Sequence, residues 1–202
     1  MLIILGVWKI HTNNFIKYST LLLIMELEVK FKCGRLEPFK KRARALGFKR
    51  VSEKRQTDTY FIINEPCKDG TRVYLRVRED KTNKSISLDY HRVLSDLETQ
   101  ELEVEVKDKK TIINILKSLG YTIKTVVNKK REIYQKNNIF LTFDTIKNLG
   151  NFIEIEINSQ LTKENKKLIE KTITALGLHK NKRITKKGYP DLLKETQLPE
   201  TS

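Results

Sequence analysis

The chain has 202 residues, of which 39% are hydrophobic and 32% are charged, so it suits one domain with a core of modest size. Its formal net charge is +15 and its pI is about 9.7, which favours polyanionic partners: nucleic acid, anionic lipid or small polyphosphates. The two cysteines, Cys33 and Cys67, lack the spacing of metal ligands, which argues against a cysteine metal site and predicts a reduced, cytoplasmic protein.

Residues 1–24 differ from the rest of the chain. The stretch MLIILGVW is apolar but too short to cross a membrane, and Lys9 and Lys17 interrupt the apolar pattern before LLLI. A secretory signal would begin with basic residues and end at small residues, and neither feature is present. We expect residues 1–24 to be an extension outside the fold, with Met25 as an alternative start of translation and no role at a membrane. The alternative is an apolar strand or helix packed on the domain.

The first predicted element is a strand at residues 25–32, where MELEVKFK alternates polar and apolar side chains. A helix is predicted next, at residues 36–48, because its apolar residues recur at helical spacing and Gly47 can end it. Four alternating segments rich in Thr, Tyr, Ile and Val then predict strands at residues 54–63, 71–80, 83–93 and 99–108.

The second half of the chain also combines segments with helical spacing of apolar residues and segments that alternate as strands do. Residues 109–120 predict a helix that ends at Gly120. Alternation then predicts three strands, at residues 123–135, 138–146 and 151–159, with a turn at Asn137 between the first two. A third helix is predicted at residues 162–178, with Thr162 as its N-cap. Residues 194–202 are expected to form a C-terminal tail.

Eight strands with only three helices between them predict an α+β fold. The strands alternate instead of being apolar throughout, which favours antiparallel pairing over a buried parallel sheet. Eight antiparallel strands commonly protect their edges by closing on themselves. We therefore predict an eight-stranded antiparallel β-barrel, a tunnel, with helices packed outside.

The charges on the alternating strands are sorted by sign. Carboxylates occur together on three strands: Glu26 and Glu28; Glu101, Glu103 and Glu105; Glu154 and Glu156. Basic groups occur together on two others: Arg76 and Arg78; Lys129 and Arg131. In one interpretation each charged face is simply exposed to water. However, like charges at i and i+2 repel, and the helices need the apolar faces of the strands to pack on. The alternative is that the charged faces line the inside of the barrel.

A barrel lined with charge cannot have a dry interior, because unpaired buried ions cost several kcal/mol each. We therefore predict a solvent-filled tunnel whose ligand carries both positive and negative charge. A complex of Mg²⁺ or Mn²⁺ with a triphosphate meets that demand, because carboxylates bind hard divalent cations while lysine and arginine bind phosphate. The sequence has no P-loop and no glycine-rich dinucleotide fingerprint, so side chains must do the binding.

Seven stretches, in order, resemble the CYTH superfamily of triphosphate tunnel metalloenzymes, which includes class IV adenylyl cyclases and thiamine triphosphatases. They are the ExExK of residues 26–30, DTYF at 58–61, LRVR at 75–78, ELEVEV at 101–106, VVNKKREIY at 126–134, FDTIKNLGNFIEIE at 143–156 and GYPDLL at 188–193. The resemblance runs from Met25 to Leu193, which sets the expected domain at residues 25–193. The residues of these motifs are most similar to those of the class IV cyclase-like branch.

The resemblance implies a role for each set of charged residues. It implies metal ligands at Glu26, Glu28, Glu101, Glu103, Asp144, Glu154 and Glu156. It implies triphosphate binding by Lys30, Arg76, Arg78, Lys129 and Arg131. Within these sets, Glu26, Glu28 and Lys30 are expected to be catalytic.

Two positions depart from the pattern of that family. His91 stands where a phosphate-binding lysine is expected, and Thr99 stands where an arginine is usual. Both changes remove positive charge from the tunnel, and Asp89 adds negative charge nearby, which brings the substrate length and the activity itself into question. We assign His91 to substrate binding as a replacement for the lysine and do not favour it as a general base.

The expected function is that of a metal-dependent enzyme on a nucleoside, thiamine or inorganic triphosphate. Attack by a ribose hydroxyl would convert ATP to cyclic AMP and pyrophosphate, whereas attack by water would release orthophosphate, and the sequence does not choose between them. The alternative is a non-catalytic protein that binds polyphosphate or nucleic acid, for which the basic segment at residues 40–44 is the best candidate surface. The sequence is compatible with a monomer and with a homodimer.

Overall fold

A computed structural model of the chain describes residues 22–63, 71–179, 182–185 and 187–197. In chain order its elements are β1 (Leu22–Cys33), α1 (Glu37–Ala45), β2 (Lys49–Phe61), β3 (Arg72–Asp80), β4 (Ser85–Val93), β5 (Glu98–Glu105), α2 (Lys109–Ser118), β6 (Ile123–Lys136), β7 (Ile139–Ile146), β8 (Gly150–Ile157), α3 (Lys163–Leu176), β9 (Arg183–Ile184) and α4 (Tyr189–Gln197). Residues 1–21 and Cys67, on which some sequence predictions fall, lie outside the described residues.

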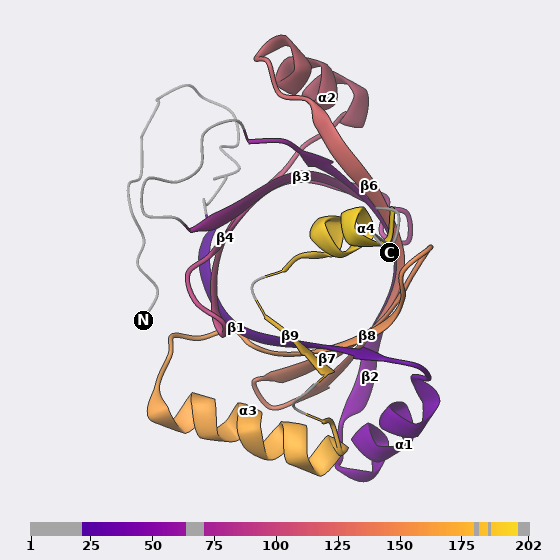
Figure 1. Ribbon diagram of the computed structural model, residues 1–202, viewed down its shortest axis with the longest axis vertical. Helices are drawn as coiled ribbons and strands as arrows, with labels where there is room; N and C mark the ends of the chain where they lie inside the picture. The colour runs from indigo at the N-terminus through magenta and orange to yellow at the C-terminus, as the bar shows by residue number, and fades with distance from the viewer. Residues whose placement is uncertain (1–21, 64–70, 180–181, 186, 198–202) are drawn as a thin grey trace, which may run out of the picture.

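The strands close into an antiparallel barrel, as the sequence predicts. The order in the sheet is β5-β4-β3-β2-β6-β7-β8-β1-β9, and pairing of β5 with β1 closes the ring. All of these pairings are antiparallel. Figure 1 shows the ring of strands end-on. Strand β9, which has two residues and pairs with β1 beyond the end of β5, carries no signal in the sequence pattern.

The N-terminal boundary of the fold differs from the predicted one. Strand β1 begins at Leu22, and the backbone of Leu22, Leu23 and Ile24 pairs with β5 opposite Glu103 to Glu101. The barrel therefore includes three residues that the sequence analysis placed in an extension outside it. The alternation in MELEVKFK marks the part of β1 with two distinct faces, whereas the preceding LLI carries no such signal.

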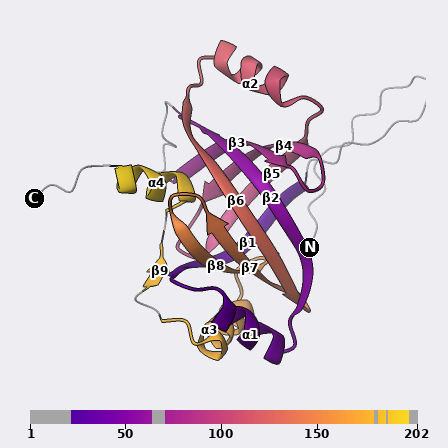
Figure 2. The same ribbon diagram turned by 90° about the vertical axis from the view of Figure 1, so that its right-hand side faces the viewer.

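The largest hydrophobic cluster lies outside the barrel wall, between the strands and two helices. In β1, Leu27, Val29 and Phe31 are fully buried or nearly so, and they belong to one cluster with Ile169 and Ile173 of α3. Helix α1 contributes to the same cluster and packs beside α3 (Figures 1 and 2). Burial of this apolar face fixes which side of each strand faces outward, so the charged side must face the interior.

Local signals cap and end these helices, and the N-cap predicted at Thr162 is confirmed. The side chain of Thr162 accepts a hydrogen bond from the backbone N–H of Asn165 at the start of α3, and Asp108 does the same for Thr111 at the start of α2. Gly177 ends α3 in the left-handed conformation, with φ of 68°. Among the described residues, no helix combines the length and apolar character that a membrane span requires.

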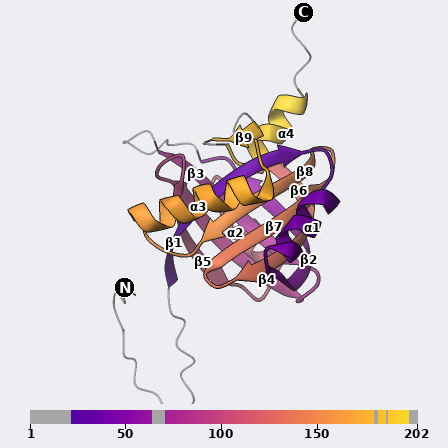
Figure 3. The same ribbon diagram turned by 90° about the horizontal axis from the view of Figure 1, so that it is seen from below.

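Helix α4 was not predicted, and it occupies a different place from the other three. It lies over one open end of the barrel, in front of the ring in Figure 1 and at its upper edge in Figure 3. Its residues Tyr189 and Leu193 belong to a second buried cluster with Tyr60, Tyr74 and Phe152. This cluster holds α4 against that end of the barrel, and residues 194–197 belong to α4 instead of the expected tail.

Candidate functional site

The interior of the barrel contains a polar cavity of about 250 Å³. Its lining residues are Glu26, Glu28, Lys30, Lys54, Tyr60, Tyr74, Arg76, Arg78, His91, Glu101, Glu103, Lys129, Arg131, Glu154, Glu156, Gly188 and Tyr189. This set brings together every site residue that the sequence analysis named, except Asp144. Six carboxylates and six ammonium or guanidinium groups therefore face one cavity, whose walls come from β1 to β6, β8 and the start of α4.

The register of the strands sets which charges meet. Glu28 lies opposite Glu156 and Lys30 lies opposite Glu154 in the pairing of β1 with β8. His91 of β4 lies opposite Glu101 of β5. Directly opposite residues in an antiparallel pair share one face and have neighbouring Cβ atoms. The charged alternation of each strand thus becomes a continuous charged inner surface.

One part of this surface is acidic, and its carboxylates repel one another. Burial, followed by the charges of Glu101 and Glu156, raises the pKa of Glu26 to about 10. Burial and the charge of Glu28 raise the pKa of Glu156 to about 7. Glu103 is the most exposed of these carboxylates, and partial loss of solvent, followed by the charge of Asp89, raises its pKa. A bound cation would reduce the repulsion between these carboxylates.

Lys30 joins the acidic and basic parts of the wall. Its Nζ lies 3.0 Å from Glu28 Oε1 and 3.1 Å from Glu154 Oε1, and 4.5 Å from the centre of the Tyr189 ring. Burial alone would lower the pKa of Lys30, but the two carboxylates outweigh burial and raise it. Lys30 is therefore held as a cation between two carboxylates that are themselves candidate metal ligands.

The basic part of the wall is held by aspartates that sequence reasoning did not place in the site. Arg78 makes a two-pronged contact with Asp58, at 2.8 and 3.0 Å, and Lys129 Nζ lies 3.0 Å from the same carboxylate. Arg76 Nε donates to Asp89 at 2.6 Å. Each guanidinium has five N–H donors on three nitrogens, so these contacts orient the group and leave donors for a ligand.

Lys129 has the most unusual surroundings of the basic residues. The side chain of Lys129 is almost completely buried, and Arg131 and Arg78 lie nearby. Burial, followed by these two positive charges, lowers the pKa of Lys129 to about 7 despite the neighbouring Asp58. A bound polyanion would restore the proton to this lysine.

Asp144 lies on the inner face of β7, directly opposite Arg131, but it is fully buried and does not line the cavity. Both of its oxygens bond to Arg131, and Oδ2 also lies 2.9 Å from the hydroxyl of Tyr189. The same hydroxyl lies 2.8 Å from Glu154 Oε1. These contacts favour a positioning role for Asp144, as the anchor of Arg131 and of the start of α4, over the metal-binding role that the resemblance implies.

The two positions that depart from the family pattern lie together. His91 Nδ1 is 2.8 Å from Glu101 Oε1. Burial alone would raise the pKa of Glu101, but His91 and Arg76 outweigh burial and lower it. Thr99 faces the interior directly opposite Glu26, and it contributes a hydroxyl where a cation was expected. This stretch of the wall is therefore less positive than the family pattern would make it.

The donor set suits a hard divalent cation. Within the described ranges, no three His, Cys, Asp or Glu side chains converge closely enough to hold a metal ion by themselves. Mg²⁺, however, is usually held by one or two carboxylates together with water and substrate phosphates. The acidic wall offers such a pair in Glu26 and Glu28, and the mutual repulsion of the buried carboxylates favours cation binding.

Comparison with known proteins agrees with this geometry. The model of the family described as "CYTH domain" matches residues 25–189. A Methanocaldococcus jannaschii protein that is named as a candidate adenylate cyclase is 30% identical over 173 residues, which cover 84% of this chain and 98% of that protein. A solved structure from Pyrococcus horikoshii OT3 has a TM-score of 0.75 at 32% identity, covering 83% of this chain and 99% of the other.

A more distant structure shares the fold alone. It comes from Hippeastrum and is described as a candidate adenylyl cyclase with a dominant triphosphatase activity. Its TM-score is 0.59 at 15% identity, and the match covers 88% of this chain and 98% of the other.

Proposed function

The chain belongs to the CYTH domain family, and from that premise we propose that it is a divalent-metal-dependent enzyme that binds a triphosphate inside its tunnel. The observation that carries the proposal is the composition of the cavity wall, in which equal numbers of acidic and basic side chains face the same enclosed space. A ligand that contains both a cation and a polyanion satisfies both sets. Mg²⁺ or Mn²⁺ with a triphosphate is such a ligand.

The two kinds of side chain would divide the work. Arg76, Arg78 and Arg131, with Lys30 and Lys129, would hold the phosphate oxygens and neutralise the charge that builds up during phosphoryl transfer. Glu26 and Glu28, supported by Glu101, Glu103, Glu154 and Glu156, would hold the cation. When bound, the metal supplies Lewis-acid polarisation of the phosphate oxygens. The protein side chains orient the chain of phosphates and keep it in line for attack.

Two reactions are consistent with this tunnel. Cyclisation of ATP gives cyclic AMP and pyrophosphate, and the name of the Methanocaldococcus relative points in that direction. Hydrolysis of an organic or inorganic triphosphate gives orthophosphate, and the activity described for the Hippeastrum protein is of that kind. We propose the shared first step, metal-assisted binding of the triphosphate, for this chain and leave the attacking group to be identified by its product.

The alternative of a nucleic-acid-binding protein has weaker support. The net charge of +15 favours it, and basic residues of α1 such as Lys41 and Arg44 are exposed on the outside of the barrel. The arginines that buried aspartates hold in place, however, lie inside a closed ring of strands. A small polyphosphate can enter such a tunnel, whereas a nucleic acid duplex cannot.

One assay tests the proposal. The purified protein is incubated with ATP, thiamine triphosphate and tripolyphosphate, each with Mg²⁺, with Mn²⁺ or with EDTA, and the products are separated. We expect metal-dependent turnover of at least one triphosphate, with cyclic AMP and pyrophosphate identifying a cyclase and orthophosphate identifying a hydrolase. Steeply salt-dependent binding with no turnover in either metal would instead indicate the non-catalytic alternative.

A further inference from the structure

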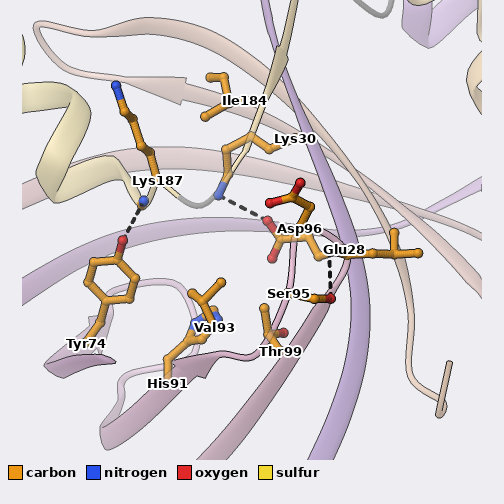
Figure 4. Close-up of a pocket in the computed structure, with 12 residues that line it drawn as sticks. Glu28, Lys30, Tyr74, His91, Val93, Ser95, Asp96, Thr99, Ile184 and Lys187 are labelled. Carbon is orange, nitrogen blue, oxygen red and sulfur yellow. Dashed lines mark hydrogen bonds and ion pairs between the residues drawn. The ribbon is translucent and has the colours of Figure 1, made fainter. Parts of the chain in front are cut away.

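A second, smaller cavity of about 50 Å³ lies beside the tunnel (Figure 4). It shares part of its wall with the main cavity, through Glu28, Lys30, Tyr74, His91 and Gly188. The rest of its wall comes from Val93, Ser95, Asp96, Leu97, Thr99, Ile184 and Lys187. We call it the side pocket.

The side pocket lies at the seam of the barrel. One edge of β1 pairs with β5 up to the pair Leu27–Glu98, and the same edge pairs with β9 at Lys30 and Phe31. Between these two partners the β4–β5 loop approaches β1, and the backbone N–H of Glu28 donates to the carbonyl of Leu97 at 2.8 Å. Because β1 changes partner here, the wall of the barrel has a recess that a continuous ladder would not leave.

Two buried polar atoms at this recess have no hydrogen-bond partner within the part of the chain that the structure describes. They are the hydroxyl oxygen of Thr99 and Nε2 of His91. Thr99 is only 8% exposed. Thr99 pairs with Val93 and Glu101 pairs with His91, so Thr99 and His91 are diagonal neighbours on the inner face of β4 and β5. Buried polar groups are normally satisfied by protein, water or ligand.

The two lysines in the wall of the side pocket, Lys30 and Lys187, already pair with carboxylates. The two polar atoms that remain belong to a hydroxyl and an imidazole, so the side pocket suits a hydroxyl more than a phosphate. The Thr99 hydroxyl can donate or accept, and a ligand hydroxyl can donate to a neutral imidazole or accept from a charged one. Val93, Leu97 and Ile184 supply apolar contact beside these polar atoms. A cavity of this size holds on the order of three or four waters, or a fragment of a few heavy atoms.

We propose that the side pocket binds a hydroxyl-bearing part of an organic triphosphate, with Thr99 and His91 as its hydrogen-bonding groups. This inference rests on the proposed function, because the triphosphate in the tunnel would bring the organic part to the pocket that adjoins it. It follows that the protein distinguishes ATP from tripolyphosphate at this pocket. Inorganic tripolyphosphate has nothing to place there and leaves the two polar atoms to water.

The test compares the affinities of ATP and tripolyphosphate for the parent and for Thr99→Val. Calorimetric titration in EDTA gives the dissociation constants without turnover, and KM values in Mg²⁺ give a second readout. We expect Thr99→Val to weaken ATP binding by roughly threefold to tenfold, the effect of one lost hydrogen bond, and to leave tripolyphosphate binding unchanged. Because the hydroxyl has no partner among the described residues, the variant should keep the thermal stability of the parent.

Thr99→Arg provides a second variant with a different signature. Its side chain would fill the side pocket and add a positive charge, so ATP should bind at least tenfold more weakly while tripolyphosphate binds as well as before or more tightly. Thr172→Val is the matched control, because it removes a buried hydroxyl from α3, where Oγ1 donates to the carbonyl of Leu168 outside the barrel. It should leave the ratio of the two dissociation constants unchanged.

The outcomes separate the two proposals. If both triphosphates bind and Thr99→Val changes neither affinity, or changes both equally, the side pocket holds only water and the inference is wrong while the proposed function stands. If neither triphosphate binds the parent in EDTA or in Mg²⁺, the proposed function fails and the side pocket assignment fails with it.

Discussion

Glu26 and Lys30 lie on the same face of β1, yet their surroundings drive their ionisation in different directions. Burial and neighbouring carboxylates raise the pKa of Glu26 to about 10, so in the metal-free protein this side chain holds a proton at neutral pH. Glu28 and Glu154 outweigh the effect of burial and keep Lys30 charged. Binding of a divalent cation at Glu26 would therefore release a proton.

At the residue scale, the surroundings of Lys129 predict a pH-dependent stability. Its pKa is about 7 in the folded protein, against 10.5 as its ordinary value, so between these pH values the unfolded chain binds more protons at this site. The contribution of Lys129 to the free energy of unfolding therefore rises with pH across that window, by at most about 1.4 kcal/mol per pH unit.

Lys129→Met removes the titrating group while keeping most of its length. Glu26 titrates in the same range with the opposite sign, so the quantity to compare is the difference between the parent and the variant. In urea unfolding at pH 7, 8 and 9, the free energy of unfolding should rise less with pH, or fall more, in Lys129→Met than in the parent. Parallel curves for the two proteins would show that Lys129 has an ordinary pKa.

The identities of the tunnel residues could be predicted from the sequence, but their partners could not. Period-two alternation places Arg78 and Lys129 on an inner face without saying which strand lies opposite. The register that brings Asp58 to both of them depends on β2 pairing with β3 and with β6. For the same reason, the sequence did not reveal that Asp144 of β7 lies opposite Arg131 and bonds to its guanidinium.

At the scale of single elements, β1 shows how one strand serves two functions. Its polar side chains face the tunnel, and its apolar side chains pack against the helices that cover the outside. Alternation in the sequence was sufficient to separate the two sets. It could not show where the strand begins, because the residues just before Met25 are all apolar and do not alternate with polar residues.

This division predicts that the two faces of β1 respond differently to substitution. Leu27 is fully buried in the outer core, so Leu27→Ala should lower the free energy of unfolding by about 2–5 kcal/mol. The metal concentration that supports half-maximal activity should stay the same, because Leu27 faces away from the cavity. Chemical denaturation and a metal titration on the same preparation test both parts, and a changed metal requirement would contradict the separation of the faces.

Helix α4 could not be predicted from its sequence because tertiary contacts hold it in place. Asp191 accepts hydrogen bonds from Tyr74 at 2.5 Å and Lys124 at 2.8 Å, and it also pairs with Arg72. The hydroxyl of Tyr189 reaches the buried carboxylates of the tunnel. These partners lie far away in the sequence, so no local pattern signals them.

Asp191→Asn should therefore loosen α4 without unfolding the barrel. The carboxylate charge is lost from a site with two cationic partners, so amide hydrogen exchange in residues 189–197 should become at least about tenfold faster. Exchange in β6 and β7 should remain as in the parent. Glu195→Gln, which removes only an exposed pair with Lys187, is the matched control on the same helix. Equal exchange of α4 in the parent and Asp191→Asn would contradict the role of Asp191.

At the scale of the whole molecule, the barrel has its main hydrophobic cluster outside and its charges inside. The sequence indicated this arrangement through the sorting of charge by strand and the need of the helices for an apolar surface. It did not indicate the seam at which β1 passes from β5 to β9, because closure depends on pairing between strands that are distant in sequence. The side pocket, which lies at that seam, was consequently beyond prediction.

The central claim is that the charged inner face, and not only the apolar outer face, is required for function. Metal-titrated activity of Glu26→Gln and Glu28→Gln, measured beside the parent and Leu27→Ala, tests it most directly. Each glutamine keeps the shape of the side chain and one oxygen but removes the charge that the cation needs.

We expect each glutamine variant to lose activity by ~10²-fold or more at saturating metal, or to need a much higher metal concentration, while remaining folded. Leu27→Ala should show the opposite pattern, with reduced stability and an unchanged metal requirement. If Glu26→Gln and Glu28→Gln both retain the activity and the metal dependence of the parent, the acidic wall does not bind the catalytic metal and the proposed function is wrong.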